Sequence, residues 1–404
     1  MHIVFDARII QDHFPGIGRY AFNLLRELPN QLRESERVTA LHDPSAQNTH
    51  YDLQTLQAAN VSLADWHAPI FRTSGALAAV PMHGDVAHFP YYLRPTRAGM
   101  PSVTTIHDTI TLAYPRYTPS ARKRLSIFLM NGLAILASRK IIAVSHSAAA
   151  DIGKYFPFAK GKLVVIHEAA DAIFQPQSAA RCAEVRAKFN LPESFVFFLA
   201  SNKPHKNLVG LMEAWLLVIR NWLLGNSQSL ITNDQSTNNP PPTLIVAGLH
   251  DARDTSAQQR AQELGIADSV RFMGSVSNED LAALYSACTA FVFPSFYEGF
   301  GFPPLEAMAC GAAVACANTS SQPEVVGDAA LLFDPHQPQQ IANSLLQLLT
   351  NEDLRNDLRQ RARPQAARFS WAETAKQTLS LYREVKRQKA NPLRADLPSA
   401  FCLL

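Results

Sequence analysis

Short apolar runs alternate with helical patterns along almost the whole chain, and this alternation constrains the fold more than any other feature. The runs are bounded by turn residues, which is typical of buried strands. Helical patterns separate them, notably Arg19–Leu28 and Pro119–Ser138. Such alternation predicts parallel sheets covered by helices on both faces. The predicted strands are His2–Phe5, Arg37–Leu41, Val86–His88, Ser102–His107, Lys140–Val144, Leu163–Ile166, Phe195–Leu199, Thr243–Ala247, Val270–Phe272, Ala290–Phe293, Ala313–Ala317 and Ala330–Phe333.

Two successive α/β sets predict two Rossmann-like, doubly wound domains that face each other across a cleft and bind ligands at the carboxyl ends of their strands. A length of 404 residues suits two domains. We place the first domain at residues 1–175 and the second at 176–368, followed by a last helix at 369–389 and a tail at 390–404. The segment Asn226–Pro242 is polar and proline-ended, so we expect an inserted surface loop.

Composition narrows the function classes. A formal net charge of +3 is small for this length and disfavours nucleic acid as a partner. The cysteines show no C-x-x-C pair or metal spacing, which indicates reduced thiols in a cytoplasmic protein. The N-terminus is strand-like rather than a signal peptide. The longest apolar run, Ser126–Ala137, is interrupted by Asn131 and is too short to span a bilayer.

Basic residues bracket that apolar run, and two interpretations remain open. We favour a core helix with solvated charges. The alternative is a basic rim that touches an anionic membrane or a lipid-linked acceptor, which would make the protein peripheral at the inner membrane face. The basic residues are Arg116, Arg122, Lys123, Arg124, Arg139 and Lys140.

The stretch Phe291–Pro323 carries the strongest chemical signal. It places two carboxylates, Glu298 and Glu306, on either side of a glycine-rich turn at 299–302 that opens a helix. The glycines let the backbone approach a ligand closely, and a helix N-terminus is an anion site suited to a diphosphate. We expect Glu306, in the first helical turn, to accept hydrogen bonds from sugar or ribose hydroxyls. Diphosphate and hydroxyl contacts together describe a nucleotide-sugar.

Residues 298–314 read EGFGFPPLEAMACGAAV, and residues 318–335 continue as NTSSQPEVVGDAALLFDP. This block resembles the donor site of the retaining glycosyltransferases of family 4, which carry two Glu residues separated by seven others. Ala313 stands where the family usually has Pro. The resemblance covers roughly Met1–Lys386. It implies the GT-B fold, an α/β architecture of two Rossmann-like domains, with a last helix that returns to brace the first domain.

The resemblance also implies an activity. Family members are hexosyltransferases that move a sugar from a nucleotide-diphosphate donor to a glycan or lipid-linked acceptor in polysaccharide synthesis. Members with similar NTSSQPEV and HDTI segments often transfer mannose from GDP-mannose, and we favour that donor. The nucleotide-sugar is a substrate, and we expect no cofactor.

A glycine-rich segment, Gly16-Ile17-Gly18, follows the first strand and precedes a helix. With Ala21 and Asp43 it also fits a dinucleotide fingerprint, which would indicate a nicotinamide dehydrogenase. We discount that interpretation because Gln11–Pro15 makes the turn too long for tight strand–glycine–helix geometry. The segment better resembles the family's G-G-I-G-R-Y loop, which faces the donor phosphates.

Two further motifs follow strands. Thr105–Asp108 resembles the family's I-H-D motif, in which the His, here His107, lies near the transferring sugar and the acceptor. A buried His is more often a satisfied core residue, but the strand-end position favours function. Asn202–Asn207 resembles the family's E-P-R-K-N loop, in which the Lys, here Lys206, neutralises the leaving diphosphate. His205 stands where Arg is common and Ser201 where some members carry a second Arg, so charge compensation is in question.

The resemblance therefore assigns roles to particular residues. Phe272 lies where members hold the nucleotide base, and Ser321 with Glu324 forms a predicted capping box near the donor site. No D-x-D triplet or His/Cys metal cluster occurs in the sequence, so we expect metal-independent catalysis. The expected catalytic side chains are His107, Lys206 and Glu298. The expected donor contacts are Gly16, Gly18, His205, Phe272, Gly299, Phe300, Gly301, Phe302 and Glu306.

Three alternatives remain. A phosphorylase or an epimerase would share the GT-B fold, but the block with two Glu residues separated by seven others argues against both. A non-catalytic nucleotide-sugar-binding protein is supported by the departures at Ser201 and His205. An NAD-dependent dehydrogenase is supported by the Gly16–Ala21 fingerprint alone. Donor turnover would distinguish an enzyme from a binding protein.

Overall fold

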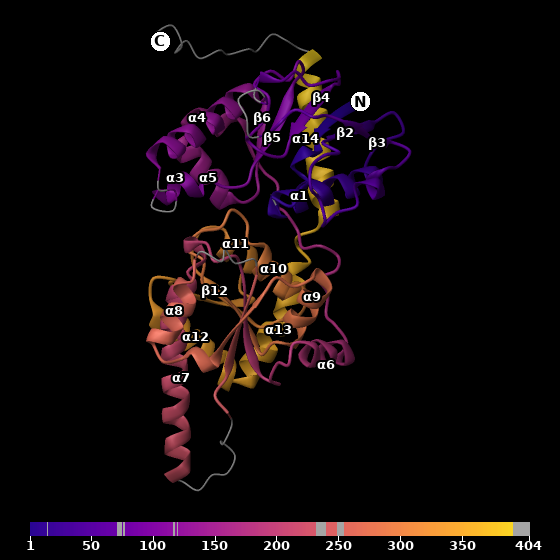
Figure 1. Ribbon diagram of the computed structural model, residues 1–404. Helices are drawn as coiled ribbons and strands as arrows, with labels where there is room; N and C mark the ends of the chain where they lie inside the picture. The colour runs from indigo at the N-terminus through magenta and orange to yellow at the C-terminus, as the bar shows by residue number, and fades with distance from the viewer. Residues whose placement is uncertain are drawn as a thin grey trace. The chain divides into compact units, whose positions relative to one another are not determined.

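The computed structural model describes residues 1–13, 15–70, 75, 77–115, 118, 120–231, 240–248 and 254–390 (Figure 1). The chain forms two compact units. Unit 1 comprises Met1–Val144, Ala148–Glu168 and the chain from Trp371 onward, and unit 2 comprises Ser145–Ser147 and Ala169–Ser370.

Unit 1 contains a seven-stranded sheet in the order β3-β2-β1-β4-β5-β6-β7, and every pairing is parallel. The predicted strands of the first half are confirmed. One edge strand, β3, was missed because VSLAD also contains a Ser and an Asp, so it is not a continuous apolar run, and it is half-exposed. The strands are β1 (His2–Asp6), β2 (Arg37–His42), β3 (Val61–Asp65), β4 (Val86–Phe89), β5 (Ser102–Ile106), β6 (Lys140–Ala143) and β7 (Leu163–Val165).

The helices of unit 1 come from both ends of the chain. The last helix, α14, packs against α1, β4 and β5, and Arg383 on it forms an ion pair with Glu36 (Nη2–Oε2 2.6 Å). Its Tyr382 hydroxyl hydrogen-bonds the buried His88 ring. The helices are α1 (Pro15–Glu27), α3 (Ile110–Ala113), α4 (Ala121–Ala137), α5 (His146–Tyr155, begun by two residues of unit 2) and α14 (Trp371–Ala390).

Unit 2 contains a six-stranded parallel sheet in the order β10-β9-β8-β11-β12-β13. Its central strands are continuous apolar runs, as expected when helices cover both faces. The predicted strands of the second half are confirmed. They are β8 (Phe195–Leu199), β9 (Thr243–Ala247), β10 (Val270–Gly274), β11 (Ala290–Phe293), β12 (Val314–Ala317) and β13 (Ala330–Phe333).

The helices of unit 2 correct one expectation. The predicted loop at Asn226–Pro242 begins too early, because α7 continues as a helix to Ile231 and its end projects past the other elements of unit 2 in Figure 1. Residues 232–239 of that segment lie outside the described part. The helices are α6 (Ala179–Lys188), α7 (Leu208–Ile231), α8 (Ser256–Glu263), α9 (Asn278–Ala287), α10 (Phe302–Ala309), α11 (Gln322–Val326), α12 (Pro338–Thr350) and α13 (Glu352–Ala366).

The segment Pro204–Leu224, most of which belongs to α7, is long and apolar enough to cross a membrane. In its most apolar stretch, 39% of the residues are buried. Helix α7 packs against α12 and α8, so its apolar face has partners within unit 2. One such helix is weak evidence for a span, because a core helix of the same composition passes the same test.

Candidate active site

The strand order of unit 2 reverses between β8 and β11. β8 and β11 are neighbouring central strands. The chain leaves β8 toward β9 on one side and leaves β11 toward β12 on the other, which opens a crevice at the carboxyl ends of β8 and β11. The loop after β8 carries Lys206, and the loop after β11 carries Glu298. The topology therefore brings together two side chains that are 92 positions apart in the sequence.

Lys206 and Glu298 form an ion pair, with Lys206 Nζ 2.7 Å from Glu298 Oε1. Both side chains are mostly buried, at 16% and 13% exposed, and Nζ also lies 5.4 Å from the centroid of the Phe293 ring. A mostly buried pair is less screened by salt than a surface pair. A diphosphate that binds Lys206 must therefore compete with Glu298 or share the ammonium with it.

The backbone of the β8 loop is fixed by Asn207. This residue adopts a left-handed conformation (φ 58°), and its amide Nδ2 donates to Pro335 O at 2.8 Å. Gly210 lies against it, since a Cβ there would meet Asn207 Oδ1 at 2.3 Å. The His205 carbonyl accepts from Phe296 N at 2.8 Å, which ties this loop to the loop after β11.

His205 does not replace the charge of the family's Arg. Burial, and then the positive charge of Lys206, lower the pKa of His205 from 6.5 to about 4. The ring is therefore neutral at neutral pH. Lys206 and the exposed Lys203 supply the positive charge of this loop.

Serine hydroxyls fix the turn between Glu298 and Gly301. Ser321 Oγ, fully buried, donates to the carbonyl oxygens of Glu298 (3.0 Å) and Phe300 (2.6 Å). Ser145 Oγ donates to Gly299 O at 2.6 Å. In a trans peptide the N–H points opposite the C=O, so these bonds aim the following amides away from the serines. The sequence did not identify Ser145 as part of this site.

The turn requires glycine at 301 for conformational reasons. Gly301 has φ 111°, and a Cβ there would meet nothing within 4 Å, so backbone strain rather than space excludes other residues. Phe300 is buried and packs edge-on against Phe302 and Phe369, each at 5.7 Å between ring centroids. The aromatic rings thus hold the turn from within unit 2.

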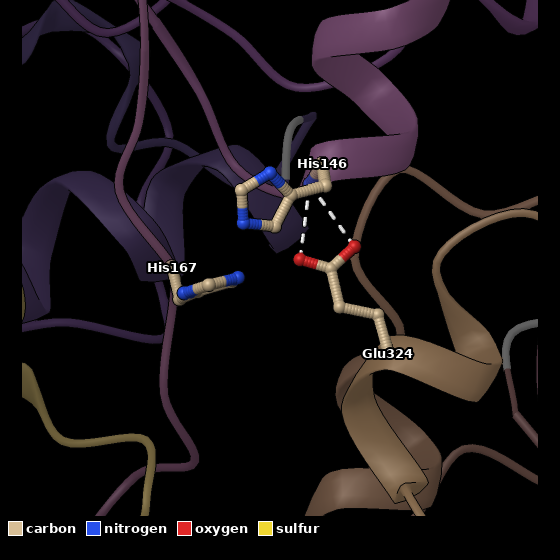
Figure 2. A group of neighbouring side chains, drawn as sticks. All are labelled: His146, His167 and Glu324. Carbon is tan, nitrogen blue, oxygen red and sulfur yellow. Dashed lines mark hydrogen bonds between the residues drawn. The ribbon is translucent and has the colours of Figure 1, made fainter.

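The predicted capping box of Ser321 and Glu324 is not formed. Ser321 caps no N–H of α11, since its hydroxyl serves the glycine turn. Glu324 instead accepts hydrogen bonds from the backbone N of His146, at 3.0 Å to each carboxylate oxygen (Figure 2). His167, also drawn there, belongs to unit 1. Glu324 thereby holds the short segment Ser145–Ser147, and Ser145 of this segment bonds Gly299 O.

Glu306 lies deeper than expected. It is the fifth residue of α10, not part of the first turn, and is 1% exposed. Its Oε2 accepts from the hydroxyl of the buried Tyr285 at 3.3 Å. Pro303 and Pro304 have no N–H, so the start of α10 offers fewer donors to an anion than an ordinary helix N-terminus. The backbone amides of the glycine turn have to supply the rest.

Phe272 lies on the edge strand β10. The register with β9 shifts between Phe272 and Gly274, and Gly274 has φ 75°. The Phe272 side chain is half-buried. Its expected role at the nucleotide base stays a prediction.

His107 follows β5 in unit 1 and is held at both ring nitrogens. Nδ1 lies 3.0 Å from Glu168 Oε1, and Nε2 lies 2.9 Å from the carbonyl oxygen of Pro90. Burial alone lowers the pKa of His107, but the hydrogen bond and charge of Glu168 outweigh it, and the net pKa shift is upward. Glu168 was not predicted as a site residue, because it lies in none of the motifs.

The glycine segment of unit 1 lies inside a helix. Helix α1 begins at Pro15, so Gly16 and Gly18 form its first turn rather than a loop before it. Gly16 is exposed and Gly18 is buried, with a built Cβ 3.4 Å from Ile9 O. One turn further along, the buried Tyr20 ring packs edge-on against His107 at 4.9 Å.

Two cavities lie among the described residues of unit 2. A cavity of about 1070 Å³ is bordered by Gly311, Arg359 and Phe369, and one of about 380 Å³ by Lys203, Phe296 and His336. Glu298, Lys206 and Glu306 line neither of them. Within each unit taken alone, the described residues bring no three His, Cys, Asp or Glu side chains into metal-ligand geometry.

Known proteins resemble this chain over most of its length. It matches the family model "Glycosyltransferase Family 4" over residues 15–172 and "Glycosyl transferases group 1" over residues 183–365. The O-antigen chain mannosyltransferase B of Escherichia coli is 30% identical, over 95% of this chain and 100% of that protein. The serotype-specific mannosyltransferase WbdA of Escherichia coli is 34% identical, over 68% of this chain and 32% of that protein.

Solved structures share the fold at lower identity. The sucrose-phosphate synthase from Thermosynechococcus elongatus superposes with a TM-score of 0.72 at 19% identity, covering 95% of this chain and 99% of that one. Anabaena Alr3699/HepE, in complex with UDP and glucose, gives a TM-score of 0.70 at 19% identity with the same coverage. These likenesses show the fold of two parallel-sheet units.

Proposed function

Because the chain belongs to family 4 of the glycosyltransferases, with the GT-B fold, we propose that it transfers mannose from GDP-mannose to a glycan or lipid-linked acceptor. The proposed transfer retains the anomeric configuration, needs no metal ion and serves surface-polysaccharide synthesis. Family membership makes the protein a glycosyltransferase, which displaces the dehydrogenase interpretation.

The Lys206–Glu298 pair at the switch point of unit 2 is the observation that carries this proposal. It places a cation for a diphosphate beside a carboxylate for sugar hydroxyls, which a nucleotide-sugar requires. The choice of mannose is supported by the mannosyltransferase relatives of Escherichia coli, and the choice of GDP rests on the resemblance of the sequence motifs. The acceptor class is supported by the O-antigen relative alone.

In the proposed reaction, the bond between the anomeric carbon and the diphosphate oxygen breaks while the acceptor hydroxyl adds on the same face. Lys206 and the amides of the glycine turn stabilise the charge that develops on the diphosphate, the main electrostatic contribution. Glu298 orients the sugar and Glu306 the ribose hydroxyls. A leaving phosphate oxygen takes the acceptor's proton. His107 and the Gly16–Gly18 turn keep the roles that the resemblance implies.

A donor screen tests the proposal directly. We expect GDP-mannose to raise the melting temperature more than UDP-glucose or NAD, because a ligand at a hundred times its Kd stabilises the folded state by about 2.7 kcal/mol. The protein should also release GDP slowly from GDP-mannose, and this release should continue when EDTA removes divalent metal ions. Greater stabilisation by UDP-glucose would refute the donor, release that requires Mg²⁺ would refute metal independence, and binding without turnover would favour a non-catalytic protein.

Helix α4 supports a peripheral membrane contact. The favoured interpretation as a core helix is wrong, because only Asn131, Ala134 and Ile135 of α4 are buried. Leu125 and Leu129 are 58% and 52% exposed. The exposed apolar stripe comprises Leu125, Phe128, Leu129, Leu133 and Leu136, with Phe158 beside it.

Charge indicates what covers this stripe. Helix α4 has no acidic residue, and Arg122 and Lys123 are exposed at its start. Arg124 and Lys140 have other partners, since Arg124 donates to Thr118 O and Lys140 pairs with Glu384, and Arg116 lies outside the described residues. An apolar stripe with a basic flank fits the surface of an anionic membrane. We place the protein at such a surface, where a lipid-linked acceptor would be found.

Vesicle sedimentation tests this contact. Replacing Arg122 and Lys123 with Gln should weaken binding to phosphatidylglycerol-containing vesicles about thirtyfold at low salt, from about 1 kcal/mol per charge. Replacing Leu129 and Leu133 with Gln should also weaken it. The matched control changes Leu223 and Leu224 to Gln, because these residues are equally exposed on α7. If all variants bound the vesicles as well as the unaltered protein does, the membrane proposal would be refuted. It would also be refuted if the unaltered protein did not bind them.

A further inference from the structure

Glu168 is a buried carboxylate that the sequence analysis did not identify. It follows β7, two strands from β5, and reaches back along the carboxyl edge of the unit 1 sheet to His107. Its side chain is 2% exposed. A carboxylate this deeply buried requires a compensating charge or hydrogen bonds, and the Glu168 carboxylate lies against Nδ1 of the His107 ring.

The two partners of His107 determine where its protons lie. A backbone carbonyl can only accept, and so can an ionised carboxylate. Nδ1 faces Glu168 at 3.0 Å and Nε2 faces Pro90 O at 2.9 Å, so each nitrogen needs a proton to bond its partner. A neutral imidazole would leave one nitrogen lone pair facing an oxygen.

We propose that Glu168 is a positioning residue, which holds the His107 side chain as an oriented imidazolium cation at the carboxyl edge of the unit 1 sheet. The proposal deepens the proposed function and rests on it for the role of His107 in transfer. An imidazolium with both N–H groups engaged cannot act as a general base. It offers a fixed positive charge instead, which leaves proton removal from the acceptor to the phosphate oxygen.

The other groups around His107 are consistent with this state. Asp108 adds a second negative charge that favours the protonated ring. Tyr20 from α1 presents an uncharged ring, because burial raises the pKa of its hydroxyl. His88 from β4 stays neutral, since burial and then the charge of His107 lower its pKa to about 3. Glu168 is thus the acidic side chain in direct contact with the ring.

Ring-carbon NMR of His107 tests the proposal without any substrate. The resonance is assigned by its loss in His107→Gln, and its titration is compared in three proteins. The unaltered protein should show an imidazolium at neutral pH. Glu168→Gln keeps an accepting oxygen but removes the charge, so His107 should titrate at least about one pH unit lower. Asp108→Asn, which removes a charge but leaves Glu168 and Pro90 O opposite the two ring nitrogens, should shift it less.

The pH profile of kcat separates positioning from a merely structural role. In Glu168→Gln the alkaline limb should move to lower pH by the same amount as the NMR titration, and activity should recover toward acidic pH. Glu168→Asp keeps the charge, so the alkaline limb of its kcat profile should lie close to that of the unaltered protein. A neutral His107 in the unaltered protein, or an unchanged titration in Glu168→Gln, would overturn the proposal. Failure of GDP-mannose as donor would leave the NMR result intact and would refute only the proposed function.

Discussion

Lys206→Met is expected to lower kcat/KM for sugar transfer by about a hundredfold to a thousandfold, while the protein stays folded. The substitution removes the cation that stabilises the departing diphosphate, and losing one preorganised group of this kind has an effect of that size. In the unaltered protein the Lys206 ammonium lies 2.7 Å from the Glu298 carboxylate. Without that ammonium, the carboxylate is free to repel the diphosphate. Steady-state kinetics with the confirmed donor would measure the loss.

Two further variants separate these causes. Lys203→Met removes an exposed lysine from the same loop and should have a much smaller effect. If exposure of the Glu298 charge caused most of the loss, the double variant Lys206→Met with Glu298→Gln would be more active than Lys206→Met alone. A Lys206→Met enzyme as active as Lys203→Met would exclude Lys206 from phosphate binding.

Glu306→Gln should weaken the binding of GDP by about tenfold to a hundredfold. Hydrogen bonds from ribose hydroxyls to a carboxylate contribute about 1.5–3 kcal/mol, and the neutral amide cannot replace the charge. Glutamine keeps the volume of this buried side chain and an oxygen for the Tyr285 hydroxyl, so the fold should persist. Isothermal titration calorimetry with GDP measures the change.

Inorganic pyrophosphate provides the matched control ligand, because it carries the diphosphate without a ribose. Glu306→Gln should leave its affinity unchanged. Tyr285→Phe controls for the Tyr285–Glu306 contact itself, and should lower the stability of the fold by about 1 kcal/mol with little effect on GDP. Unaltered GDP affinity in Glu306→Gln would show that Glu306 supports the fold and does not bind the donor.

Much of the fold could be predicted from the pattern of apolar residues. A central parallel strand is buried on both faces, so its sequence is a continuous apolar run such as Phe195–Leu199, and such runs are hard to miss. The edge strand Val61–Asp65 escaped because an edge strand has solvent on one side and needs fewer apolar residues. Helix α7 extends past its expected end because, once a helix has formed, each further residue gains a backbone hydrogen bond, even when its side chain is polar.

The candidate site divides in the same way. Lys206, Glu298 and the glycine turn were predicted as site residues because they lie in contiguous motifs that resemble those of the family, and the structure pairs Lys206 with Glu298. Glu168, Ser145 and the true role of Glu324 could not, because each acts through one contact with a residue far away in the sequence. The neutral state of His205 was equally hidden, since burial sets it.

The order of residues along the chain was enough to predict two doubly wound sheets, the family, and a nucleotide-sugar block that follows a strand of the second sheet. These follow from local periodicity and from motifs that are contiguous in the chain. The tertiary structure alone decided which side chains pair, which helix faces stay exposed and which groups carry charge. The physical reason is that burial and charge pairing depend on neighbours supplied by distant segments, as Glu168 does for His107.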